Sequence, residues 1–465
     1  MKHLDTNGAW KAGHYTVIII LFILLTILAL RIITRLFTIS QPNKDIQQTH
    51  RKIGLEPALT NLSSQFSGEH QPAPGKPIVL QSLWIYPLKS CQGIEVSRSR
   101  VLPVGLEFDR LYTFAQLKKV TGPLGSEGSK DDQYKWEFIT QRQYPLLASL
   151  NVELWQPDPA KPKADGKGYI LFRFPWKGTR ISLTSVIAKL AGGWNDKPEK
   201  EVRLPVDFPT DKEIRTKGYT FESCSIWKDK VIALNMEKEL PSELSLYLGT
   251  RHRLGLFRID PGRLRQVHRC APAKVDAGYQ PVTGFQDAYP VHLINIASVQ
   301  DLASKIKMDD ILPCLDVQRF RANIIGKSIR YPFIQDTLGL VELTEGICLV
   351  SGAAAYDEDS WKFIAFESPT SSSVKRPRFH VSCRTVRCKQ PNVNQITGVK
   401  HEIEPFKAMR THRRIDEGAP LKGCMGMEMT PLFSQVDVPE NMEHTLVVGM
   451  TLKVIERGSH RYIDS

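Results

Sequence analysis

Residues 379–398 read FHVSCRTVRCKQPNVNQITG and carry the strongest chemical signal in the chain. Cys388 directly follows Arg387, and a further arginine and a lysine stand nearby. Cationic neighbours favour the thiolate form of a cysteine, which is the form that binds metals or attacks electrophiles. Four residues separate Cys383 from Cys388, too many for a CxxC zinc knuckle, and no second pair of cysteines or histidines completes a zinc set. We therefore interpret Cys388 as a single soft ligand to a cofactor, with a structural free cysteine at a strand edge as the alternative.

The composition is that of a globular protein. The 465 residues leave room for two or three domains at roughly 150 residues each. The eight cysteines are scattered singly, which fits a reducing compartment better than a disulfide framework. A net charge of +13 favours an acidic partner, an anionic cofactor or a membrane surface. Because the sequence has no zinc finger, no aromatic RNA-binding strand and no basic helix with a dimer seam, no nucleic-acid partner is expected.

The N-terminal region has the composition of a membrane anchor. Residues 15–30 contain no charged side chain, and two isoleucines extend the apolar run past Arg31. No small-residue cleavage site follows, so the pattern predicts a transmembrane helix over 15–36 rather than a signal peptide. The excess of basic residues on its C-terminal side places the large C-terminal part in the cytosol. We expect a tail over 1–14 and a polar, flexible tether over 37–77.

From residue 78 onward the pattern changes to short β-like runs. The expected strands cover 78–86, 136–140, 149–155, 169–174, 320–325, 363–366 and 445–455. Helices are few, and the clearest covers 298–307. A helix that begins at Ser298 would present free N–H groups to an anion, with an ordinary N-cap as the alternative. The acidic run 357–359 is interpreted as a solvated turn. These patterns predict a β-rich α+β fold, without the βαβ alternation of a nicotinamide-binding domain.

Six motifs, in this order, resemble one family. IYPLKSCQG (85–93), GLEFDR (105–110) and ITQRQYP (139–145) resemble the N-terminal β-barrel domain of the MOSC proteins. RFRANI (319–324), YDEDSW (356–361) and RCKQPNVNQITG (387–398) resemble the MOSC domain itself. The resemblance implies a MOSC N-terminal β-barrel domain over 78–240 and a MOSC β-barrel domain over 241–457. With the anchor added, the arrangement is similar to the mitochondrial amidoxime-reducing components.

The resemblance implies a molybdenum cofactor, a pterin dithiolene that carries a phosphate. Cys388 matches the cysteine whose thiolate ligates molybdenum, which makes it both the metal ligand and the catalytic residue. The positions that match cofactor-holding residues are Lys89, Ser90, Arg110, Ser298, Arg321, Asn323 and Arg387. These residue types suit the group, because guanidinium forks and a lysine pair with phosphate and an asparagine offers both a donor and an acceptor.

The chain also departs from the family pattern. The run after the ligand cysteine, KQPNVNQITG, is two residues longer than in the reductases and carries Asn394 where an aspartate stands. Ala322 replaces the proline of the family's RFRPN motif. These differences leave cofactor binding in place and leave the substrate range open.

The resemblance implies a two-electron reductase of small N-hydroxylated substrates such as amidoximes. Electrons would come from a cytochrome b5-type haem protein and its NADH-dependent reductase. A single-pass anchor in the mitochondrial outer membrane, with the catalytic part in the cytosol, is the expected location, and the endoplasmic reticulum is the alternative. A second hypothesis is a module that binds the cofactor or carries sulfur without reductase activity. A third is a membrane tether or interaction protein that binds no metal.

Overall fold

The computed structural model describes residues 22–29, 44–70, 77–119, 134–161, 166–176, 199–328, 353–368, 376–433 and 442–463. The chain divides into two compact units. The first comprises Met1–Arg51, Pro157–Gly166 and Lys177–Pro198. Its described part contains α2 (Lys44–Thr49), where the ammonium group of Lys161 donates to two backbone carbonyls at the end of the helix, 2.7 and 3.0 Å away. The second unit contains the remainder of the chain.

The second unit contains a closed barrel of five strands. In spatial order they are β11 (Thr220–Ile226), β12 (Asp229–Asn235), β13 (Leu254–Arg258), β6 (Tyr112–Lys119) and β7 (Tyr134–Phe138). A parallel pairing of β11 with β7 closes the circle, and the other four pairings of the barrel are antiparallel. Trp136 and Phe257 meet edge to face inside this barrel, with ring centroids 5.3 Å apart.

A larger sheet in the same unit also closes on itself. Its order is β17 (Ile324–Ser328), β16 (Val291–Asn295), β20 (Cys424–Leu432), β19 (Arg378–Val386), β18 (Trp361–Glu367), β22 (Thr451–Arg457), β2 (Ile78–Ile85) and β3 (Ile94–Val96). An additional pairing of β2 with β17 joins the two sides of the sheet. The strand β2, from the N-terminal part of the chain, therefore completes a sheet built mainly from the last third of the chain.

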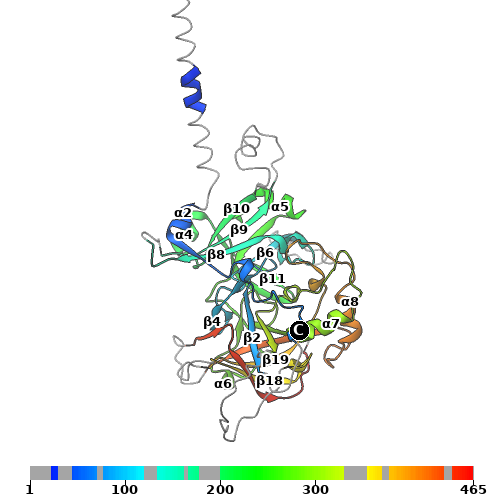
Figure 1. The fold of residues 1–465 in the computed structure, drawn as a ribbon. Coiled ribbons are helices and arrows are strands. Elements are labelled where there is room, and N and C mark those ends of the chain that lie inside the picture. The colour runs from blue at the N-terminus through cyan, green and yellow to red at the C-terminus, as the bar shows by residue number, and fades with distance from the viewer. Residues whose placement is uncertain are drawn as a thin grey trace, which may run out of the picture. The chain divides into compact units, whose positions relative to one another are not determined.

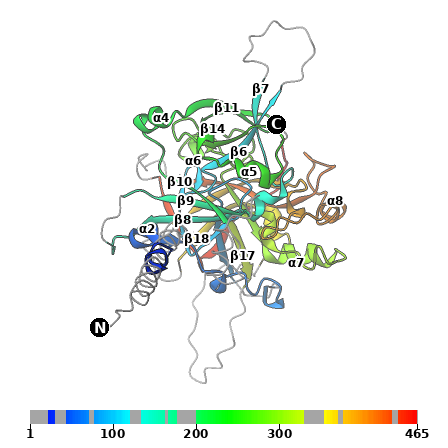
Figure 2. The same cartoon turned by 90° about the horizontal axis from the view of Figure 1, so that it is seen from above.

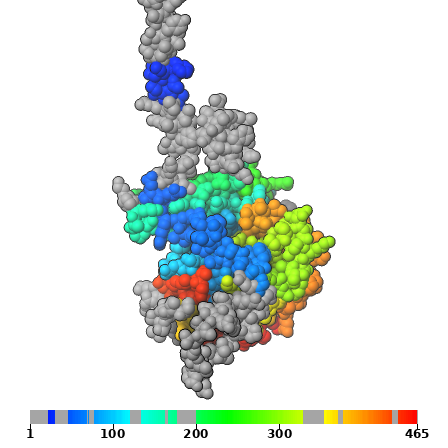
Figure 3. All heavy atoms as spheres, viewed as in Figure 1, coloured from blue at the N-terminus to red at the C-terminus, as the bar shows by residue number. Residues whose placement is uncertain are grey.

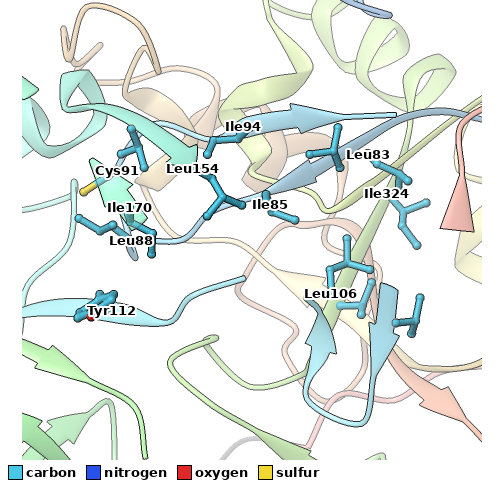
Figure 4. Packing of buried hydrophobic residues seen from close by; sticks show 14 of the residues in the cluster. Leu83, Ile85, Leu88, Cys91, Ile94, Leu106, Tyr112, Leu154, Ile170 and Ile324 are labelled. Atoms are coloured by element: carbon cyan, nitrogen blue, oxygen red, sulfur yellow. The ribbon is translucent and has the colours of Figure 1, made fainter. Parts of the chain in front are cut away.

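The sequence of β2 explains this position. Seven of its eight residues, IVLQSLWI, are buried. Successive side chains of a strand point to opposite faces, and here both faces are covered. Leu83 and Ile85 contribute to one core, and Trp84 contributes to another. Figure 4 shows Leu83 beside Ile324 on β17, while Ile85 points toward Leu154.

The remaining strands form three smaller sheets, β1-β8-β9-β10, β21-β4-β5 and β14-β15. These strands are β1 (His50–Ile53), β4 (Arg98–Leu102), β5 (Gly105–Leu106), β8 (Asn151–Pro157), β9 (Tyr169–Pro175), β10 (Glu199–Pro205), β14 (Arg265–Gln266), β15 (Val282–Thr283) and β21 (His444–Val447). The other helices are α4 (Asp211–Lys217), α5 (Ser242–Leu248), α6 (Lys274–Ala277), α7 (Ile296–Ser304) and α8 (Phe406–His412). Helices α7 and α8 lie on the same side of the unit in Figure 1 and Figure 2 and pack into one core. Figure 3 shows their yellow-green and orange regions adjacent on the surface.

Four local predictions are wrong. The closing strand expected over 445–455 is two strands, β21 and β22, with a turn between them. The acidic run 357–359, expected to be a solvated turn, lies in a 3₁₀ helix in which Glu358 is buried. The helix expected from Ser298 begins at Ile296, because the side chain of Asn295 accepts a hydrogen bond from the Ala297 N–H and so caps the helix. The strand expected over 320–325 begins only at Ile324, after a short 3₁₀ helix and a residue in the left-handed conformation. The β-rich character itself agrees with the prediction.

The predicted fold class is corrected in its membrane helix. Within the described ranges, no helix is long and apolar enough to cross a bilayer. Of the anchor expected over 15–36, only residues 22–29 are described, as helix, and the others lie outside the described residues. The tether expected over 37–77 contains α2, β1 and two 3₁₀ turns between residues 44 and 70, so this part is structured.

Candidate functional site

Two of the residues predicted to hold a cofactor, Lys89 and Arg110, lie in loops next to strands. Lys89 follows β2 and Arg110 precedes β6, and the backbone joins the two loops: the Lys89 N–H donates to the Tyr112 carbonyl and the Arg110 N–H donates to the Tyr86 carbonyl, both at 2.8 Å. Ser90 lies in the first of these loops and is 3 % exposed. Two segments that are separated in the chain by β3, β4 and β5 are thereby held together.

Three predicted site residues adopt a strained backbone conformation. The φ angles of Ser90, Arg110 and Arg321 are +69°, +51° and +53°. Residues other than glycine rarely adopt this left-handed conformation, which costs on the order of 1–2 kcal/mol each. Such strain concentrates where the surrounding fold must aim particular side chains, so its occurrence at three of the eight predicted positions supports a functional site here.

Two guanidinium groups enclose the ring of Tyr86. Their central carbons lie 4.6 Å (Arg110) and 4.2 Å (Arg321) from the ring centroid. The Nη2 of Arg110 donates to the carbonyl of Arg321 at 3.3 Å, and its Nη1 pairs with the Asp109 carboxylate at 2.5 Å. Burial raises the pKa of Tyr86 to about 12 although both arginines act in the opposite direction. The neutral phenol ring thus separates two like charges.

Arg321 is a buried cation with an incomplete set of partners. The side chain is 4 % exposed, and its Nη1 donates to the Cys91 carbonyl at 2.6 Å and to Gln395 Oε1 at 2.9 Å. Its Nη2 is buried without a hydrogen-bond acceptor. Burial lowers the pKa of Arg321 to about 10. A buried donor of this kind costs free energy unless a partner is supplied, and an anionic ligand would supply one.

Arg387 is held by three acceptors beside Cys388. Its Nε donates to the Met425 carbonyl at 2.8 Å, its Nη1 to the Phe320 carbonyl at 3.2 Å and its Nη2 to His292 Nε2 at 2.6 Å. Burial lowers the pKa of Arg387 to about 10, while the neighbouring Cys388 is among the groups that raise it. Cys388 is itself a free, half-buried thiol, two residues after the end of β19.

His292 is a neutral imidazole in this arrangement. A guanidinium group can only donate, so the His292 Nε2 must accept, which leaves the proton on Nδ1. Burial holds the pKa of His292 well below its ordinary value, and the charges of Arg387 and Arg110 act in the same direction. The histidine therefore fixes the orientation of Arg387 without adding charge.

Lys89 forms an ion pair at the edge of the same cluster. Its ammonium group donates to the Phe285 carbonyl at 2.8 Å and contacts the Asp287 carboxylate. Burial lowers the pKa of Lys89, and the pairing with Asp287 offsets this in part. Burial alone would raise the pKa of Asp287, but the charge of Lys89 and its hydrogen bond, with one from Trp227, outweigh burial and hold it below the usual range. Arg110 influences both groups, so the ion pair belongs to the cluster.

Glu428 is a site residue that the sequence analysis missed. It lies on β20, opposite His292 in the strand register. Burial raises the pKa of Glu428 to about 7; Asp287 raises it further, and Arg387 and Arg110 lower it. A single carboxylate within the apolar run CMGMEMTPL was the available signal. The structure thus adds a carboxyl group that titrates near neutrality to the cation cluster.

Two predicted site residues, Asn323 and Ser298, form hydrogen bonds that link parts of the fold. The amide of Asn323 accepts from the His292 N–H at 3.2 Å and donates to the Trp84 carbonyl at 3.1 Å, which links β16 to β2. The fully buried Ser298 hydroxyl donates to Glu358 at 2.7 Å and accepts from the Tyr356 N–H at 2.8 Å. The described contacts of Ser298 therefore lead to the turn at 356–358 and not to the cation cluster. A role of either residue in holding a cofactor stays a prediction.

Comparisons with known protein families agree with the motifs. Residues 78–186 match the MOSC N-terminal beta barrel domain, and residues 280–459 match the MOSC domain. The chain is thus a MOSC-domain protein in which both domains follow one another. The division at residue 240 remains a prediction; β2 and β13 lie on either side of it and each completes a sheet with strands from the other side.

Among curated proteins the similarity is distant but extended. Mitochondrial amidoxime reducing component 2 of Rattus norvegicus is 21% identical over 339 residues, which cover 72% of this chain and 73% of the relative. Mitochondrial amidoxime-reducing component 1 of Homo sapiens is 22% identical over 370 residues, covering 79% and 80%. The Mus musculus component 1 is 20% identical, covering 77% of each chain.

Proposed function

We propose that this protein is a molybdenum-cofactor oxidoreductase that reduces small N-hydroxylated compounds. The observation that carries the proposal is the cluster of Lys89, Arg110, Arg321 and Arg387, in which the buried Nη2 of Arg321 lacks an acceptor. Such a set of donors fits a phosphorylated, anionic cofactor. The half-buried thiol of Cys388, adjacent to Arg387, fits a soft metal ligand.

The residues divide the task of holding the cofactor. Arg110 and Arg321, already oriented by Tyr86, would bind the phosphate, and Lys89 would contribute a further positive charge. Arg387 would stabilise the Cys388 thiolate as it binds the metal. When bound, the cofactor would supply the two electrons that reduce an N–OH group to N–H with release of water.

Reduction of an N–OH group to N–H and water consumes two protons as well as two electrons, and Glu428, beside the cation cluster, is a group that can hold and release a proton. Glu428 has a pKa of about 7, and the charges of Arg387, Arg110 and Asp287 all act on it. An acid whose pKa lies near the working pH is well suited to proton transfer. The neutral His292 accepts a hydrogen bond from Arg387 and so fixes the orientation of that arginine.

The electrons would come from an external haem protein. By family resemblance the donor is a cytochrome b5-type protein with its NADH-dependent reductase, and the net charge of +13 would favour association with an acidic donor. Turnover with this donor should therefore fall as ionic strength rises from low to physiological salt. The names of the relatives motivate a mitochondrial location, which fractionation with a tagged full-length chain would test.

The deciding experiment measures molybdenum, pterin and activity in the full chain, produced in a host that synthesises molybdenum cofactor. We expect about one molybdenum per chain and reduction of benzamidoxime by a chemically reduced cytochrome b5. Cys388→Ser should abolish the reduction, whereas the matched variant Cys314→Ser, at an exposed thiol, should not. Folded protein without molybdenum or pterin would refute the proposal. Cofactor without amidoxime reduction would favour the cofactor-binding or sulfur-carrier module instead.

A further inference from the structure

Two cysteines, Cys270 and Cys383, lie outside the cation cluster and close to each other. Cys383 on β19 is fully buried, and Cys270 is a partly exposed residue that follows β14. Cys270 packs against a small buried cluster made of Val267, Tyr289 and Cys383. Segments far apart in the sequence therefore bring two free thiols into one contact group, one accessible to solvent and one shielded from it.

Cys270, Cys383 and Tyr289 belong to one contact group, and each thiol interacts with the other and with the tyrosine. The tyrosine hydroxyl also donates to the Arg269 carbonyl at 2.6 Å, and the Cys270 thiol lies 3.5 Å from the Arg461 carbonyl. The tyrosine and the C-terminal segment thereby hold Cys270 in place.

The pair is chemically asymmetric. The hydrogen bond from Cys383 lowers the pKa of Cys270 to about 6, although burial acts in the opposite direction. The same hydrogen bond and burial raise the pKa of Cys383 well above its ordinary value. In contrast, burial raises the pKa of Cys91 and of Cys424 to about 12 each. Cys270 is thus set apart as an accessible nucleophilic sulfur with a second sulfur beside it.

We propose that Cys270 and Cys383 form a peroxide-sensitive dithiol that closes reversibly into a disulfide. The Cys270 sulfur attacks hydrogen peroxide, the O–O bond breaks, and Cys270 becomes a sulfenic acid as the first water leaves. The Cys383 sulfur then displaces the hydroxyl group, loses its proton and releases the second water. Two thiols and one peroxide give one disulfide and two waters. The bond would tie the loop after β14 to the strand that leads to Cys388.

The test uses the full chain, fully reduced and then treated with an equimolar amount of hydrogen peroxide. Remaining thiols are alkylated and the protein is mapped by mass spectrometry. We expect one cross-linked peptide that joins Cys270 to Cys383, its reversal by dithiothreitol, and oxidation of Cys270 about tenfold or more faster than that of exposed Cys314.

Variants separate the two steps. Cys383→Ser should leave Cys270 as a sulfenic acid that reacts with dimedone, and Cys270→Ser should leave Cys383 reduced. The proposal is overturned if wild-type Cys270 proceeds to the sulfinic acid while Cys383 stays a thiol, or if Cys270 reacts no faster than Cys314. Because the wild-type map alone gives these results, a failure of Cys383→Ser to fold would not obscure them. The readout does not depend on bound cofactor, so it is independent of the proposed reductase activity.

Discussion

Substitution of Arg321 tests whether its buried guanidinium group binds an anionic ligand. In Arg321→Gln the unpartnered Nη2 disappears, together with the bonds from Nη1 to the Cys91 carbonyl and to Gln395. If a cofactor phosphate supplies the missing acceptor, the substitution removes a hydrogen bond between charged groups. Such a bond contributes about 1.5–3 kcal/mol, so the cofactor should be retained about 10- to 150-fold less tightly.

Two opposing changes determine the stability of the cofactor-free protein. The lowering of the pKa of Arg321 from 12.5 to about 10 corresponds to on the order of 3 kcal/mol against the charged form in the folded state. The substitution removes this penalty but also removes two hydrogen bonds with a charged donor, each of which contributes about 1.5–3 kcal/mol. These two changes oppose each other, so the cofactor-free protein should lose at most about 3 kcal/mol of stability.

The assay compares molybdenum per chain after extended dialysis with the thermal unfolding of the loaded and the cofactor-free protein. Arg258→Gln is the matched control, because Arg258 is equally buried, at 4 % exposure, and also has one buried donor without an acceptor, its Nε, but does not belong to the cation cluster. It should destabilise both forms by a similar amount and leave cofactor retention unchanged. Retention in Arg321→Gln within twofold of wild type would refute the reasoning, as would an equal loss in Arg258→Gln.

Three further predictions concern the fold. Burial raises the pKa of Glu358 from 4.5 to about 7, so the folded state keeps a proton that the unfolded state releases, and the protein loses on the order of 3 kcal/mol as pH rises through that range. The free energy of unfolding is measured in urea at pH 5 and at pH 8. Glu358→Gln should remove the loss of stability due to Glu358, and the control Glu402→Gln, at an exposed residue, should not. Asn323→Ala should lower the free energy of unfolding by about 2–4 kcal/mol, because both hydrogen bonds of the Asn323 side-chain amide go to buried backbone groups of two strands. A loss under about 1 kcal/mol would contradict this. Gly105→Ala should be more destabilising than Gly166→Ala: both have positive φ, but only at Gly105 would the new Cβ meet a backbone oxygen, at 2.4 Å.

Local sequence signals located the chemistry but not its surroundings. The pattern around Cys388 marked a candidate ligand, and the resemblance of RFRANI marked Arg321. The left-handed conformation of Arg321 and the 3₁₀ helix before it had no clear signal in a run of mixed polar and apolar residues. Ser298 was predicted to begin the helix because serine favours the N-cap position. In the structure Asn295 is the N-cap, and Ser298 is buried inside the helix.

The sequence by itself determined the class of this protein: the β-rich character, the run 78–86 that becomes a strand buried on both faces, and the motifs that place both MOSC domains. These properties follow from local periodicity and from the order of short motifs, which folding does not alter. The tertiary structure alone decided which polar groups meet. The cluster around Tyr86, the carboxyl of Glu428 opposite His292, and the contact of Cys270 with Cys383 each join segments distant in the chain. Strand pairing and barrel closure create such contacts, and the resulting burial shifts the pKa values on which the chemistry depends, so no local pattern can encode them.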